Sequence, residues 1–107
     1  MNIWGNNYAS VVRTFKDINN PLVICTSPFF PSLHKNEIIK LICINTNSLF
    51  VDLSSITLLD KTNYANSERH YDNTGIGIHP GDKGMESIAN TIFIAINFFI
   101  MSRNIVK

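Results

Sequence analysis

One histidine in this chain stands where its side chain could transfer a proton. His79 follows a glycine-rich run, Thr74–Ile78, and precedes Pro80 and Asp82, two residue types that favour the start of a helix. An imidazole changes its charge near neutral pH, and a loop before a helix presents such a group to solvent. The sequence therefore marks His79 as a candidate catalytic residue. The alternative is a surface histidine in an ordinary turn.

The helix after His79 is predicted from Asp82 to about Met101, because apolar residues recur there at spacings of three and four. Its far end is apolar on every side, which predicts that neighbouring elements cover it. The most apolar segment, Ile92–Met101, is interrupted by Asn97 and is shorter than the roughly 20 residues that span a bilayer. We therefore expect no membrane span.

Upstream, short apolar runs alternate with helical patterns, and one long polar connection follows. Short apolar runs are read as buried strands and 3.6-residue periodicity as amphipathic helices. The predicted strands are the end of one at Met1–Trp4, then Leu22–Cys25 and Leu49–Leu53; the predicted helices start at Tyr8 and at Glu37; the connection is Ser54–Ile78. This order predicts one α/β domain over residues 1–107, with a parallel sheet and helices on both of its faces.

Polar residues lie at or just past the end of each predicted strand. They are Asn7, the pair Thr26 and Ser27, and Asp52. In open α/β sheets, ligands bind outside the carboxyl ends of the strands. We expect these side chains to line that edge.

Composition sets limits on the function. The 107 residues carry a formal net charge of +1, which gives no indication of a nucleic-acid partner. Cys25 and Cys43 lie inside apolar runs and are predicted to be buried free thiols. No zinc spacing and no signal peptide is visible, so no cofactor is expected and the compartment is unknown.

The residues His79 to Met85, read H-P-G-D-K-G-M, and the Ile-Ala that follows resemble the last block of the SGNH (GDSL-type) serine esterases. The resemblance implies a flavodoxin-like three-layer sandwich and makes His79 the general base of acyl-ester hydrolysis, with carbohydrate O-acetyl or lipid esters as substrates. Gly5-Asn6-Asn7 resembles the block that supplies an oxyanion donor, which would be Asn7. In the same comparison, Phe29 and Phe30 would flank the substrate cleft.

Two departures from this family matter. No G-D-S nucleophile segment occurs in the sequence, so the chain resembles only a C-terminal portion, incomplete at the N-terminus of the sheet and inactive alone. Ser27 is the one serine that could substitute, although Pro28 favours a turn there. Many members carry Asp three residues before the histidine, where this chain has Ile76, so the imidazole would be oriented by Asp72, by Glu68 or by a backbone carbonyl.

The missing strand would leave a sheet edge open to association with a second polypeptide. A non-catalytic remnant or interaction module of the same fold is the alternative function. A metal site from His70, Asp72, His79 and Asp82 is a further alternative, although their spacing matches no standard ligand pattern.

Overall fold

The computed structural model describes residues 2–30 and 32–106. They form two compact units, the N-terminal unit Met1–Asp52 and the C-terminal unit Leu53–Lys107.

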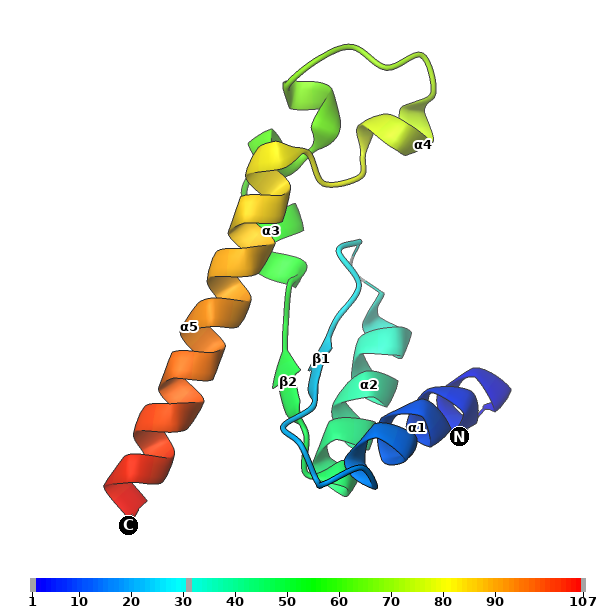
Figure 1. Ribbon diagram of the computed structural model, residues 1–107. Helices are drawn as coiled ribbons and strands as arrows, with labels where there is room; N and C mark the ends of the chain where they lie inside the picture. The colour runs from blue at the N-terminus through cyan, green and yellow to red at the C-terminus, as the bar shows by residue number, and fades with distance from the viewer. Residues whose placement is uncertain (1, 31, 107) are drawn as a thin grey trace. The chain divides into compact units, whose positions relative to one another are not determined.

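The N-terminal unit contains two helices and two short parallel strands (Figure 1). Its elements are α1 (Ile3–Lys16), β1 (Ile24–Thr26), α2 (Leu33–Thr46) and β2 (Leu49–Val51). The strands pair in register from Ile24 with Leu49 to Thr26 with Val51. Between them, α2 is the crossover helix, and α1 packs beside it over a small core. The buried core residues are Ala9, Val12, Cys25, Ile38, Ile39, Ile42 and Cys43.

The first predicted strand is wrong, because the chain is already helical there. The side chain of Asn2 accepts a hydrogen bond from the backbone N–H of Gly5 at 2.8 Å and caps α1. Ile3 and Trp4 therefore belong to the helix, and Gly5 is a buried position inside it rather than a break. Consequently Asn7 lies in the first half of α1 and not at the end of a strand.

Asparagines form the turns that end both helices of this unit. Asn19 and Asn20 adopt positive φ values of 60° and 47°, and Asn47 does so at 55°. Asparagine tolerates this left-handed region better than most residues, so these positions stop α1 and α2 without glycine. The second predicted helix is confirmed as α2, although it begins at Leu33 rather than at Glu37.

The predicted flavodoxin-like three-layer sandwich is wrong. The structure is 64% helix and 8% strand, and the described residues contain one sheet of two parallel strands. Each strand is only three residues long, and the first of the three expected strands is helical at Ile3 and Trp4. Two such strands offer too little surface for a helical layer on each face.

The C-terminal unit is helical (Figure 1). Its elements are α3 (Ser54–Leu59), the 3₁₀ turns η1 (Lys61–Asn63) and η2 (Ala65–Ser67), α4 (Thr74–Gly77) and α5 (Asp82–Val106). The long connection predicted as polar loop is thus a series of short helical turns, of which η1 is capped by the side chain of Asp60 and α4 by that of Asn73.

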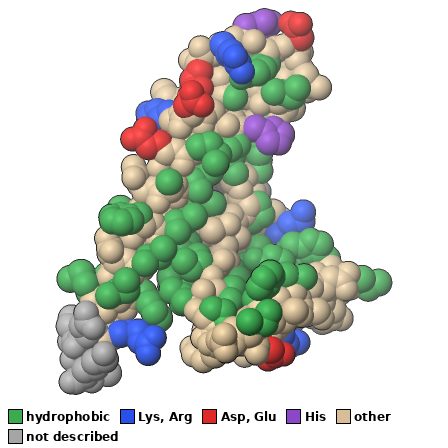
Figure 2. Space-filling model, in the orientation of Figure 1, with side chains coloured by type: hydrophobic (Ala, Val, Ile, Leu, Met, Phe, Trp, Pro, Cys, Tyr) green, Lys and Arg blue, Asp and Glu red, His purple; other side chains and the backbone are tan. Residues whose placement is uncertain are grey.

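The far end of α5 is exposed, so the prediction that it is well covered is wrong. Within this unit, α5 packs against α3 and η1, but its later turns carry exposed apolar side chains (Figure 2). Among the described residues, one helix is long and apolar enough to cross a membrane by length and composition, the 22-residue stretch Asp82–Arg103. This stretch is longer than the segment singled out in the sequence. One helix of this kind is weak evidence for a span.

Candidate functional site

Backbone hydrogen bonds on both sides fix the main chain around His79. The carbonyl of His79 accepts from the N–H of Ala65 at 2.8 Å, and the N–H of Gly81 donates to the carbonyl of Asn63 at 3.0 Å. These two bonds flank an isolated antiparallel bridge between Tyr64 and Pro80. The loop before α5 is therefore attached to the turn between η1 and η2, fourteen or more residues earlier in the chain.

A backbone carbonyl orients the His79 imidazole. Nδ1 lies 2.5 Å from the carbonyl oxygen of Gly75, one helical turn earlier, and the side chain is exposed. Because a carbonyl can only accept, Nδ1 must carry the proton. In the neutral imidazole Nε2 then has a free lone pair, which is the arrangement that a general base needs.

The glycine-rich run before His79 is the short helix α4 rather than an open loop. The side chain of Asn73 accepts from the N–H groups of Gly75 and Ile76 and so starts the turn. Gly77 is buried, and a Cβ there would lie 3.0 Å from the Cβ of Asn66. Gly77 therefore allows α4 to pack closely against η2.

Neither carboxylate considered as the orienting acid makes a described hydrogen bond to His79. Glu68 accepts from the N–H of Lys83 at 3.0 Å, so it caps α5 from outside the helix. This hydrogen bond, with a second from the N–H of Asp82, lowers the pKa of the Glu68 carboxyl group. Asp72 forms an exposed ion pair with His70 at 3.0 Å. Of the three groups considered for orienting the imidazole, the backbone carbonyl of Gly75 is the one that forms the hydrogen bond.

Asn63 is a central residue of this region that the sequence analysis missed. It is buried, and its amide donates to the carbonyl of Ile56 at 3.0 Å while its Oδ1 accepts from the hydroxyl of Ser87 at 2.8 Å. The side chain thus joins α3 to α5, and its backbone carbonyl holds Gly81. In a chain this rich in asparagine, no pattern distinguishes Asn63 from its exposed neighbours.

An exposed polar network attaches the first turn of α5 to η1. The ammonium of Lys83 lies 2.8 Å from Oδ2 of Asp60 and also contacts the hydroxyl of Thr62. Thr62 in turn donates both its N–H and its hydroxyl to Oδ1 of Asp60. The Lys83 hydrogen bond and then those of Thr62 lower the pKa of Asp60 from 3.8 to about 2.

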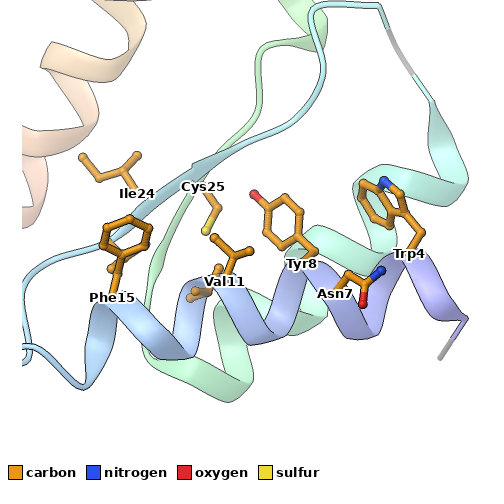
Figure 3. A pocket seen from close by; sticks show the side chains of 9 residues that line it. Trp4, Asn7, Tyr8, Val11, Phe15, Ile24 and Cys25 are labelled. Carbon is orange, nitrogen blue, oxygen red and sulfur yellow. The ribbon is translucent and has the colours of Figure 1, made fainter.

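Asn7, the predicted oxyanion donor, lies in the N-terminal unit, whereas His79 belongs to the C-terminal unit. It is exposed and lines an apolar groove of about 450 Å³ between α1 and β1, together with Trp4 and Phe15 (Figure 3). The structure gives its surroundings, and its oxyanion role stays a prediction.

Tyr8 and Cys25 meet in this groove (Figure 3). Burial is the largest cause that raises the pKa of the Tyr8 hydroxyl above its ordinary range, and a hydrogen bond with Cys25 adds to it. Burial likewise raises the pKa of Cys43 to about 12. Both cysteines are free and buried, as predicted. The Cys43 thiol therefore stays protonated at neutral pH and is a poor nucleophile.

Two of the residues expected at the carboxyl edge of the sheet do meet. The hydroxyl of Ser27 donates to Oδ1 of Asp52 at 3.1 Å, across the ends of β1 and β2. Ser27 is only 1% exposed, which leaves no room for a substrate carbonyl to approach its Oγ. It is therefore a structural residue at a strand end and not a substitute nucleophile.

Within the described part of the chain, no three His, Cys, Asp or Glu side chains are placed to share a metal ion. Comparison with protein families, with curated proteins and with solved structures gives no match.

Proposed function

We propose that this chain supplies the general base of an acyl-ester hydrolase, His79, and that a serine outside this sequence is the nucleophile. The observation that carries the proposal is the Nδ1 hydrogen bond to the Gly75 carbonyl, because it leaves Nε2 unprotonated and exposed. In the reaction, Nε2 would take the serine proton and return it to the leaving alcohol. Asn7 would donate to the oxyanion.

The overall fold gives no support to this proposal, because the predicted three-layer sandwich is wrong. It is supported by the local resemblance around His79 and by the hydrogen bonds that fix this loop. The partner would be a small-molecule ester, an acylated carbohydrate or a lipid ester, and the open edge of β1 beside the apolar groove suits an added strand.

The tautomer of His79 is the first quantity to measure. Two-bond ¹H–¹⁵N NMR correlations distinguish a proton on Nδ1 from one on Nε2 in each of the three histidines. We expect His79 to be the Nδ1–H form when neutral. A predominant Nε2–H form would remove the free lone pair and overturn the proposal.

Hydrolysis of p-nitrophenyl acetate tests the same nitrogen by chemistry. This ester is reactive enough for an imidazole to attack it without a serine. We expect His79→Ala to remove most of the rate of the purified chain, and the matched variant His70→Ala to leave it nearly unchanged. Equal losses for both variants would show that His79 is an ordinary surface histidine.

The alternative function is a non-catalytic interaction module. It is favoured by one observation, the large apolar side chains exposed in both units. A chain whose ester hydrolysis is unaffected by His79→Ala would support this alternative.

A further inference from the structure

The longest helix of the chain has a charge pattern that needs explanation. No charged side chain lies between Ser87 and Ser102, while Lys83 and Glu86 precede this stretch and Arg103 follows it. At 1.5 Å per residue, the uncharged stretch is about 24 Å long, and Lys83 and Arg103 are about 30 Å apart along the axis. The hydrocarbon core of a bilayer is about 30 Å thick.

This stretch is also uncovered. Only 6% of its most apolar window is buried, whereas the core helix of a soluble protein is mostly buried. Ile94, at the middle of the stretch, is 66% exposed, and Phe98 is 72% exposed. Hydrophobic side chains follow the surface of α5 (Figure 2). Exposed apolar area of this extent marks a surface that another apolar phase covers.

Two hydroxyl groups of the stretch are satisfied within the helix itself. The hydroxyl of Thr91 donates to the carbonyl of Ser87, and that of Ser102 donates to the carbonyl of Phe98, each at 2.8 Å. Such bonds let Ser and Thr enter hydrocarbon at low cost. The hydroxyl of Ser87, at the start of the stretch, donates to Asn63. Asn90 and Asn97 are the other polar side chains, and their spacing of seven residues puts them on one side of the helix.

The end of the stretch has an anchor. The guanidinium of Arg103 lies 5.6 Å from the centre of the Phe99 ring, so its stem covers the helix while its charge stays at the end. Long cationic side chains extend from apolar surroundings to a headgroup layer in this way. We propose that α5 inserts into a phospholipid bilayer from Ser87 to Ser102, with Lys83 and Arg103 at opposite headgroup layers.

Flotation with phosphatidylcholine vesicles tests the proposal on the full chain. We expect the chain to float, and Ile94→Lys, at the centre of the stretch, to weaken vesicle binding about 100-fold. The matched control is Leu33→Lys, which puts the same charge at an exposed apolar position of the other unit. It should float like the unmodified chain. Asn97→Leu should bind more strongly, because it removes an amide from hydrocarbon.

A second measurement detects insertion of α5 without introducing a charged side chain. In a Trp4→Phe background, Phe98→Trp should be quenched by vesicles with brominated acyl chains. A chain that stays in the dense fraction, an equal loss for Ile94→Lys and Leu33→Lys, or no quenching would each overturn the proposal. A soluble dimer whose formation Ile94→Lys abolishes would show instead that a second copy covers α5.

Discussion

Replacement of Gly84 by alanine should destabilise the loop that holds His79. A Cβ at position 84 would lie 2.3 Å from the carbonyl oxygen of Asn63 and 2.9 Å from the Cβ of Pro80. Carbon and oxygen normally stay more than about 3.3 Å apart, so backbone must move by about 1 Å. Such overpacking costs about 1–3 kcal/mol. The displaced carbonyl also loses the N–H of Gly81, at about 1 kcal/mol.

Alanine has a higher helix propensity than glycine by about 1 kcal/mol, which offsets part of this cost. We therefore expect Gly84→Ala to lower the free energy of unfolding of the C-terminal unit by about 1–3 kcal/mol. With a urea m-value of about 1–3 kcal/mol/M, the midpoint falls by about 1 M. The assay is a urea titration followed through the NMR signals of Ala65 and Gly81, since both amides report on this loop.

The matched control is Gly81→Ala. Its Cβ would lie 2.7 Å from the Glu68 carboxyl group, which is the far end of a flexible, exposed side chain. Glu68 can rotate away at the cost of one helix cap, about 1 kcal/mol or less. The reasoning is refuted if Gly84→Ala is as stable as the unmodified chain, or if both alanines cost the same.

Three more perturbations have expected outcomes. Ile42→Ala opens a cavity at a side chain that is 1% exposed and should cost about 2–5 kcal/mol in a denaturant titration followed by tryptophan fluorescence. Asn63→Ala leaves buried partners without hydrogen bonds and should cost about 2–3 kcal/mol by the NMR titration, whereas exposed Asn66→Ala should cost almost nothing. Because the folded pKa of Asp60 is lowered from 3.8 to about 2, its stabilising contribution is complete above about pH 4 and is lost between pH 4 and 2. Lys83→Met should raise the pKa of Asp60 toward 3.8 and flatten this acid dependence, as a side-chain NMR titration measures.

The sequence correctly predicts the helices and strands whose formation depends on local apolar periodicity. The apolar spacings around Ile38 give α2, those around Ile88 give the first turns of α5, and the apolar run at Leu49 gives β2. Burial of Cys25 and Cys43 follows from the same runs. These signals need only nearest neighbours along the chain.

The features that the sequence did not reveal depend on contacts with residues far along the chain, or on one helix-capping hydrogen bond. The cap of Asn2 converts an expected strand into helix, and with it removes the third strand of the sheet. Glu68 caps a helix that begins fourteen or so residues later, and no local pattern contains that distance. Asn63 is structurally important because its side chain hydrogen-bonds to Ile56 and Ser87, and its residue type does not indicate these partners.

The two proposals together make the distance of His79 from the bilayer a test of the substrate class. His79 lies three residues before α5 and eight before Ser87. Five helical residues rise about 7.5 Å and the three residues before the helix span at most about 10 Å, so His79 lies within about 17 Å of the proposed hydrocarbon boundary. Headgroup layers add about 5–8 Å on each side of the core. Lipid acyl esters lie at the inner side of this layer, so Nε2 would reach them only where the loop before α5 turns back toward the bilayer.

Paramagnetic headgroup lipids can test this depth. In vesicles that contain them, the imidazole signals of His79 should broaden strongly, and Ile94→Lys should abolish the broadening because the chain no longer inserts. Sharp His79 signals in a chain that remains vesicle-bound would place the imidazole away from the lipid esters. The geometry would then favour a soluble acylated carbohydrate, with α5 acting only as the anchor.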